Sequence, residues 1–438
     1  MSKPSASRIH LIVAAAAVSF LCALPVVAES SARIVRLSDV HGTVEINKNS
    51  GAGFESAFLN LPVTQGSTVR TGSNGRAEVE FEDGSSIRLA PNTTVEFSKL
   101  SLSDSGTRVS QVNLVEGMAY CNLLGKDDFS LTFSQETATL AHAAHFRLDA
   151  SSEVANLAVY KGEVNVEGPA GKVTVEKKRT ATFNVADEDK YTVENKIAEA
   201  PLDSWDKESI AYHDQYAKNN SSPYGYGIAD LNYYGAYSNV PGYGLMWQPY
   251  FAGVGWDPFL DGAWGWYPGF GYMFASAYPW GWLPYRYGNW MFVPGFGWMW
   301  QPGMWGSWVT VPRFTTTRLV HVTPLVAPTS GVKTVMVGKA VKTSTFPVRT
   351  LNAGSAGIGI PRGSMRNLGH LNQQVAKNGF VQVRPTPQFA ATSPSRGSSG
   401  GYSQPRGYSQ PHSSMGSAPV GHTTSSMGHA SAGGTSHR

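Results

Sequence analysis

The sequence predicts an all-β protein that consists of an acidic β module, a short helix, an aromatic β-hairpin repeat and a disordered C-terminal tail. Short runs of alternating apolar and polar residues recur through the first half of the chain, as in half-buried strands. The chain has 47 glycines and 26 prolines among 438 residues, so turns are frequent. Only 15% of the residues are charged, and the charge is separated along the chain.

Residues 1–28 have the organisation of a secretory signal peptide. A basic start precedes an apolar run from Leu11 to Leu24, and small residues lead to a cleavage site after Ala28. This run is shorter than the roughly 20 residues that span a membrane, and no later segment is uniformly apolar at that length. We therefore expect an exported protein of the periplasm, cell envelope or medium, without an integral membrane span. Cleavage leaves one cysteine, Cys121, whose apolar surroundings predict a buried, unreactive thiol.

Residues 32–200 form the predicted β module. In the run 76–81, alanine, valine and phenylalanine alternate with arginine, Glu78 and Glu80, so we expect both glutamates on an exposed face. The same alternation recurs at 44–46, 129–133, 154–160, 163–167 and 172–176. Glycine-containing turns separate the runs. The pattern predicts a sandwich, a barrel or a β-solenoid.

Four segments of this module, 42–46, 66–72, 75–85 and 87–89, resemble the FecR domain. In that family a turn glycine, a Thr-Gly pair and an Asp-Gly-Ser run separate successive strands, as they do here. The resemblance implies a β-sandwich or β-solenoid that contacts a protein or a ligand in the cell envelope. FecR itself is a signal transducer with a transmembrane helix and a cytoplasmic segment, which we do not find in this sequence. We therefore do not carry the signalling role over.

The β module shows no signature of catalysis or of metal binding. The sequence contains no GxSxG, Walker or HExxH motif. His142 and His145 would point to opposite faces of a strand, and no nearby His or Cys completes a tetrahedral metal site. We expect no enzyme, no catalytic residue, no cofactor and no metal.

Residues 201–223 are predicted to form a helix and a linker. Asp203 or Ser204 would cap the helix, and Trp205, Tyr212 and Tyr216 would form a stripe that packs on a neighbouring domain.

Residues 224–308 contain 11 of the 12 tryptophans. A Pro-Gly-aromatic-Gly motif occurs at 241–244, 268–271 and 294–297, and it predicts three tight hairpins. Because an isolated hairpin is marginally stable, we expect the hairpins to stack and bury their rings, including Trp264 and Trp290 at matching positions. The segment resembles a Trp/Tyr/Pro-rich domain of unknown function that often follows FecR-like modules.

Two interpretations of the remaining rings stay open. Most rings can form an aromatic core, or some can stay exposed as binding platforms. The candidate binding aromatics are Trp256, Trp282, Trp305 and Trp308. The Gly-Trp pairs that contain the first two resemble glycan- or choline-binding repeats loosely. The other two lie past the last hairpin turn and lack a repeat partner.

The rest of the chain is basic. Residues 309–438 carry 13 Lys or Arg and no acid, which suits an anionic polymer or simply keeps a polar tail solvated. We expect residues 309–384 to be a Val/Thr-rich segment with some strand pairing but no compact domain, and residues 385–438 to be disordered.

These observations predict a non-enzymatic exported FecR-domain protein that acts as a cell-envelope interaction scaffold. The alternative is a glycan-binding module for cell-wall or capsular polysaccharide. The expected partner is an envelope protein or an anionic polysaccharide rather than nucleic acid, and the sequence does not indicate an oligomeric state.

Overall fold

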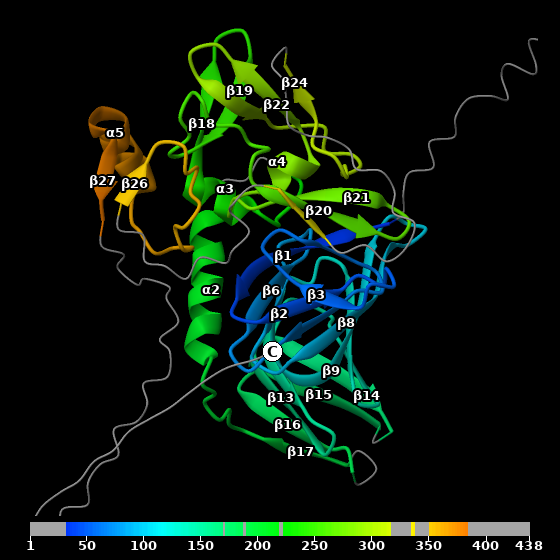
Figure 1. The fold of residues 1–438 in the computed structure, drawn as a ribbon. Coiled ribbons are helices and arrows are strands. Elements are labelled where there is room, and N and C mark those ends of the chain that lie inside the picture. Colours follow the sequence, from blue (N-terminus) through cyan, green and yellow to red (C-terminus); the bar gives the residue numbers. More distant parts are fainter. Residues whose placement is uncertain are drawn as a thin grey trace, which may run out of the picture. The chain divides into compact units, whose positions relative to one another are not determined.

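The β module is a sandwich of two mainly antiparallel sheets that share one long strand (Figure 1). The computed structural model describes residues 32–169, 171–186, 190–218, 222–316, 334–337 and 350–383. The predicted signal peptide and the predicted disordered tail therefore lie outside the described residues. The strands of the module are β1 (Ile34–His41), β2 (Val44–Asn47), β3 (Phe54–Ser56), β4 (Pro62–Thr64), β5 (Thr68–Thr71), β6 (Arg76–Glu80), β7 (Ser86–Leu89), β8 (Thr94–Leu102), β9 (Arg108–Leu123), β10 (Asp128–Phe133), β11 (Glu136–Thr139), β12 (Ala144–Ala150), β13 (Val154–Lys161), β14 (Glu163–Gly168), β15 (Gly171–Glu176), β16 (Arg179–Asn184) and β17 (Lys190–Glu194).

The strand order shows how the two sheets are built. One sheet runs β3-β2-β5-β8-β9-β10-β11-β14-β15. The other runs β4-β1-β6-β7-β9-β12-β13-β16-β17. Apolar residues from both sheets form one buried cluster between them. The all-β prediction is confirmed, and the module is a sandwich rather than a closed barrel or a solenoid.

Strand β9 crosses from one sheet to the other. Its first half pairs with β8 and β10, and its second half pairs with β7 and β12. Gly117 lies at the crossover with φ of 92°, and a Cβ at this position would overlap the backbone at Asn92 and Thr93. Only glycine fits this left-handed, crowded position. The bend of β9 therefore depends on Gly117.

The expected strands form, but one expected exposed face is buried. Strand β6 has Ala77 and Val79 in the core, as predicted, but Glu78 and Glu80 are also only 1% exposed. The exposed-face prediction for these glutamates is therefore wrong. Alternation locates the two faces of a strand, but it does not show whether another element covers the outer face.

Helices α2 (Asp203–Tyr216) and α3 (Ile228–Tyr234) cover this outer face. Neither Asp203 nor Ser204 caps α2, because the cap residue is Leu202 and makes no side-chain hydrogen bond. The aromatic stripe packs inward as expected, and Tyr212 contacts Tyr233 of α3 with 5.6 Å between ring centroids. No helix in the described part of the chain is long and apolar enough to cross a membrane.

The aromatic module contains the three predicted hairpins. Its elements are β18 (Gly235–Val240), β19 (Gly244–Pro249), β20 (Gly262–Tyr267), β21 (Gly271–Ser276), α4 (Leu283–Arg286), β22 (Asn289–Val293), β23 (Gly297–Gln301), β24 (Phe314–Thr315) and β25 (Val335–Val337). In the first turn the Tyr243 amide donates to the Val240 carbonyl at 3.0 Å, and Gly242 has φ of 80°. This is a type II turn with proline and glycine at its central positions. The other two turns repeat the same hydrogen bond.

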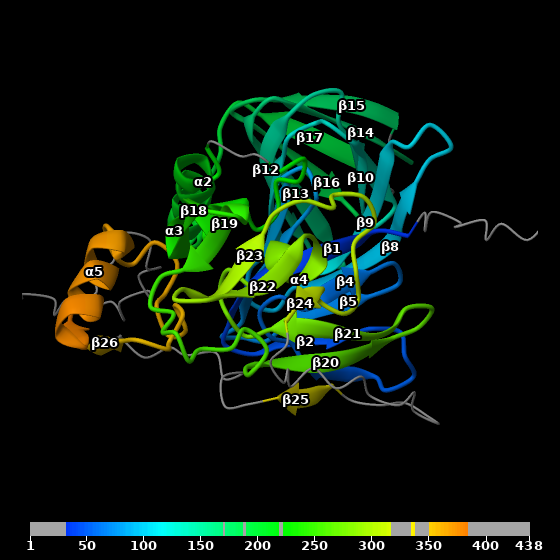
Figure 2. The ribbon, with the colours of Figure 1, turned by 90° about the horizontal axis from the view of Figure 1, so that it is seen from above.

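We expected the three hairpins to stack one after another along the chain, but their order in space differs from their order in the sequence. The first and third share the sheet β18-β19-β23-β22-β24, whereas the second pairs with β25 in a separate sheet (Figure 2). One row of aromatic residues crosses all five strands of the larger sheet: Tyr237, Trp247, Trp300, Trp290 and Phe314. The second hairpin repeats this cross-strand pair as Trp264 and Phe274. Both sheets therefore contribute to a single aromatic core.

A glycine at the start of each hairpin makes room for a ring of the opposite strand. A Cβ on Gly235 would overlap the Trp247 ring, and one on Gly262 would lie 2.5 Å from the Phe274 ring. Close approach of a ring to backbone is a general reason for glycine in strands. The repeated glycines thus belong to the packing of the repeat.

Part of the basic segment folds onto the aromatic module. Strand β26 (Thr350–Asn352), helix α5 (Leu368–Asn378) and strand β27 (Phe380–Gln382) contribute apolar residues to the aromatic core. The Trp280 indole donates to the Ala356 carbonyl at 2.7 Å. The segment has the strand pairing that we expected, between β26 and β27. Its apolar residues join the aromatic core instead of forming a core of their own, and this packing was not expected from the sequence.

The matched tryptophans of the repeat give a test of the aromatic core. Trp264 and Trp290 are 3% and 0% exposed, whereas Trp305 is only partly buried. We expect Trp264→Ala and Trp290→Ala each to lower the free energy of unfolding by roughly 3–5 kcal/mol, as for other buried aromatics, and Trp305→Ala to lower it less. Denaturant unfolding of the full chain measures this, because the core includes residues outside 224–308. Unchanged midpoints for the first two variants, with a large loss for Trp305→Ala, would contradict the aromatic-core account.

Candidate functional site

Two of the four candidate binding aromatics lie inside the protein. Trp256 is 5% exposed and its indole donates to the Tyr278 hydroxyl at 2.8 Å. Trp282 is fully buried, and its ring lies 5.4 Å from that of Tyr226. Neither ring offers an open face, because the connectors between the hairpins fill the aromatic core. Trp256 and Trp282 are therefore too buried to serve as binding platforms.

The other two candidates are partly exposed and lie on one segment that follows β23. The Trp305 ring lies 5.7 Å from Tyr287, and its backbone carbonyl accepts a hydrogen bond from the Tyr224 hydroxyl at 2.9 Å. The Trp308 ring lies 5.3 Å from Phe270. Each ring is thus supported by a second aromatic residue while part of its surface stays accessible.

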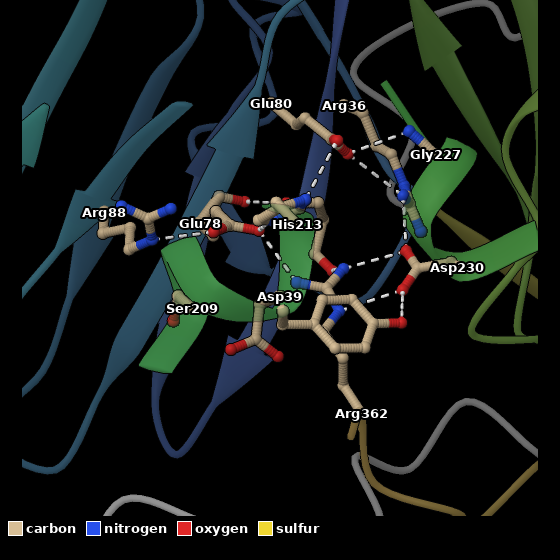
Figure 3. A network of polar contacts seen from close by, with 12 residues as sticks. Arg36, Asp39, Glu78, Glu80, Arg88, Ser209, His213, Gly227, Asp230 and Arg362 are labelled. Carbon is tan, nitrogen blue, oxygen red and sulfur yellow. Dashed lines mark hydrogen bonds and ion pairs between the residues drawn. The ribbon is translucent and has the colours of Figure 1, made fainter. Parts of the chain in front are cut away.

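A network of buried charges joins the β module to the helices and to the C-terminal segment (Figure 3). Its members come from β1, β6, β7, α2, α3 and the loop before α5. The acidic members are Glu78, Glu80, Asp206 and Asp230; the basic members are Arg36, Arg88, Arg362 and His213. The acids and the first two arginines are at most 1% exposed.

Arg362 connects three separate parts of the chain. Its guanidinium donates to Asp230 of α3 at 3.0 and 2.9 Å, to Glu78 of β6 at 2.8 Å and to the Ser38 carbonyl of β1 at 2.7 Å. The planar guanidinium suits such forked recognition. Arg362 thereby holds residues 350–383 against both the β module and α3.

Arg36 makes the corresponding connection from the β module. It pairs with Glu80 at 3.2 Å and with Asp230 at 2.7 Å, and it donates to the Pro279 carbonyl at 2.8 Å. The amide of Gly227, just before α3, donates to Glu80 at 3.0 Å. Strand β6 therefore holds the start of α3 through a carboxylate.

Helix α2 is held through two aspartates. Asp206 pairs with Arg88 of β7 at 2.9 Å and with His145 of β12 at 2.7 Å. Asp203 accepts from the Tyr120 hydroxyl at 3.0 Å and from Arg147 at 2.8 Å. The first turn of α2 is thus fixed to the outer face of the sandwich.

The charges of the network set the protonation of its members. Burial alone would raise the pKa of Glu78, but His213 and Arg88 hold it well below its usual value. Burial likewise opposes ionisation of Asp230, whose pKa is lowered by Arg362. Both groups are therefore structural carboxylates, saturated with donors.

The two histidines lie in different surroundings, and the strand expected at both positions contains only His145. His142 is exposed outside any strand, while His145 binds Asp206 and stacks on Tyr160 with 4.8 Å between centroids. Cys121 is fully buried, and burial raises the pKa of its thiol. Within the described ranges, no group of three or more His, Cys, Asp or Glu is arranged to hold a metal ion.

Sequence reasoning did not find the charge network. Its residues are far apart in the chain, and on β6 they look like an ordinary solvated face. One available signal was the isolation of Asp230, one of only four charged residues between 224 and 308. A lone carboxylate in an aromatic segment requires a partner when it is buried.

Comparison with known proteins identifies two families along the chain. Residues 67–165 match the model of the family described as FecR protein, within the β module. Residues 228–327 match the model of a family of unknown function, DUF6600, which begins at the first residue of α3. The chain thus carries a FecR domain followed by a domain of unknown function, as the two resemblances implied. No curated protein matches the chain.

Two crystal structures of a putative anti-sigma factor from Parabacteroides distasonis ATCC 8503, at 2.50 and 1.65 Å resolution, are similar to part of the chain. Each is 18% identical over the matched region. The matches cover 34% and 35% of this chain and 71% and 76% of those chains, with TM-scores of 0.28 and 0.27.

The position of His213 predicts a pH dependence of stability. Its ring nitrogens lie 3.1 Å from Glu78 and 3.6 Å from Glu80, and Arg362 also faces it. Burial opposes protonation of His213, but the two glutamates raise its pKa above the usual value. A base with a raised folded pKa stabilises the folded state below its unfolded pKa of about 6.5, and this stabilisation is lost as pH rises through the folded pKa.

We therefore expect the free energy of unfolding to fall as pH rises from about 6.5 through the raised folded pKa of His213, and to fall less in His213→Gln. Denaturant unfolding across this range measures the slope. His41→Gln is the matched control, since the pKa of His41 is also raised, by Asp39, but its side chain is 43% exposed. An identical slope in wild type and His213→Gln would show that His213 is not the titrating group.

Proposed function

We propose that the protein is a non-enzymatic exported scaffold of the cell envelope, in which the FecR domain and the aromatic domain act as one unit toward an envelope partner. The observation that carries this proposal is the buried charge network. Arg36 and Arg362 connect β1, β6, α3 and the C-terminal segment through charge-assisted hydrogen bonds. A unit fixed in this way presents a rigid surface, which lowers the entropy cost of binding.

The chemistry of the buried acids favours a structural role over a catalytic one. Glu78 already accepts from Ser38, Arg88 and Arg362. Asp230 accepts from Tyr212 and from Arg362. A general base needs a free lone pair within reach of its substrate. Carboxylates that are saturated by fixed donors instead hold the fold together.

Trp305 and Trp308 are the best candidates for partner contact. Tryptophan is enriched at the energetic centres of protein interfaces, where a large rigid ring is buried at small entropy cost. Both rings lie outside the hairpins and are supported by a neighbouring aromatic residue. Removing them should therefore affect binding more than folding.

Glycan binding is the second candidate function. A partly exposed ring can also stack on the apolar face of a sugar, and the same two rings would serve. The basic residues after 309 would add attraction to an anionic polysaccharide. The two functions share a surface, so the experiment must identify the chemistry of the partner.

Photo-crosslinking in the native envelope distinguishes them. We expect a photoreactive amino acid in place of Trp305 or of Trp308 to yield one discrete adduct that protease removes. The same residue at Thr174, an exposed position on β15, should yield none. An adduct that resists protease but is removed by polysaccharide-degrading enzymes would support glycan binding. Absence of any adduct at both positions would overturn both proposals.

Export is tested separately. We expect the protein in the extracytoplasmic fraction with its N-terminus at Glu29, because the leader has the organisation of a cleaved signal peptide. N-terminal sequencing of the fractionated protein measures this. An intact leader on protein in the cytosol would contradict the exported location.

A further inference from the structure

Strand β17 forms an edge of the sandwich. It pairs with β16 on one side, and among the described residues no strand pairs with its other side. All five of its residues are exposed, including two large apolar ones, Tyr191 at 36% and Val193 at 38%. Natural edge strands usually avoid apolar exposure because an open edge invites pairing with another chain. Strand β17, which lies at the lower end of the β module in Figure 1, is thus suited to pairing with a strand of another chain.

The exposed side chains of β17 continue the inner face of the sheet. Tyr191 lies opposite Phe183, and Val193 lies opposite Ala181. Both β16 residues are buried at 1% and 0% exposure, and the rings of Tyr191 and Phe183 are 6.1 Å apart. Residues directly opposite each other share a face of the sheet. The row of apolar side chains on the inner face of β16 therefore continues onto β17, where Tyr191 and Val193 remain partly exposed to solvent.

The sequence of β17, Lys-Tyr-Thr-Val-Glu, is complementary to itself in antiparallel orientation. We propose that β17 pairs with β17 of a second copy of this chain, about a two-fold axis at Thr192. In this register Lys190 lies opposite Glu194 of the second copy, and Tyr191 lies opposite its Val193. Opposite charges and aromatic–β-branched pairs both stabilise antiparallel pairing. Each favourable pair occurs twice, as a two-fold interface requires.

Other alignments lose this complementarity. A parallel arrangement in register places Lys190 against its own copy and Glu194 against its own copy. A shift by one residue moves the apolar side chains to the opposite face. Glu194 already pairs with Lys196 at 3.3 Å, but both side chains are more than half exposed, so this contact is weak enough to be replaced. The charges thus select one register and one partner.

The interface is short, so it implies a weak dimer whose population depends on concentration. It would join the β17 sheets of two copies into one continuous sheet. This inference goes beyond the proposed function, because it concerns self-association through the β module and makes no use of Trp305 or Trp308. The dimer proposal and the proposed function can therefore be disproved independently of each other.

Sedimentation velocity of the full chain over a concentration series tests the proposal. We expect wild type to dimerise, and Lys190→Glu and Glu194→Lys each to weaken dimerisation at least tenfold, because both paired positions then carry like charges. An equimolar mixture of the two variants should dimerise again, since each Glu of one faces a Lys of the other. The matched control is Lys172→Glu on edge strand β15, which should behave as wild type. A wild type that stays monomeric, or a mixture that does, would overturn the proposal.

Crosslinking tests the register directly. Opposed residues of an antiparallel pair have Cα atoms about 4.5–5.5 Å apart, within the range that a disulfide spans. We expect Thr192→Cys to form a covalent dimer under oxidising conditions, while Thr174→Cys on β15 does not. Cys121 is fully buried and does not compete. Equal crosslinking at both positions would contradict pairing about Thr192.

Discussion

The fold depends on two glutamates that are buried on the outer face of one strand. Removing carboxylates from water costs several kcal/mol each unless opposite charges and hydrogen-bond donors surround them. Strand β6 carries Glu78 and Glu80 side by side on this face, and the β module alone does not supply all of their partners. The remaining donors come from α2, from the start of α3 and from Arg362. The helices and the C-terminal segment must therefore be in place before β6 is electrostatically satisfied.

This constraint explains why the aromatic domain does not behave as an independent repeat. Its hairpins have the turn residues and the cross-strand rings that each repeat unit requires. However, residues from segments outside the hairpins complete their hydrophobic core. Tyr212 of α2 and Leu351 of β26 belong to the same buried cluster as Trp290. Asp230 connects this cluster to Arg36 of the β module. Apolar burial gives the domain its core, and the buried charges set which segments surround it.

Local patterns in the sequence predicted the strands, the three hairpin turns and the burial of the matched tryptophans. These features depend on alternation and on Pro-Gly chemistry over a few residues. What the sequence did not predict was decided by distant residues: the burial of Glu78 and Glu80, the hairpin order and the folding of 350–383. The same reason applies to the candidate binding aromatics, because the burial of Trp256 and Trp282 depends on rings that are distant in the sequence, such as Tyr278 and Tyr226. A single sequence contains no direct signal for such coverage.

Arg362 joins the β module and the aromatic module into one cooperative unit. Hydrogen exchange of the full chain and of Arg362→Met measures this most directly, with peptides from β6 and from β22–β23 followed together. We expect both regions of wild type to exchange through openings of similar free energy. The substitution should lower protection in both regions, because it leaves Glu78 and Asp230 short of a donor. Loss of protection in β22–β23 alone, with β6 unchanged, would show that the two modules unfold independently and would contradict the account.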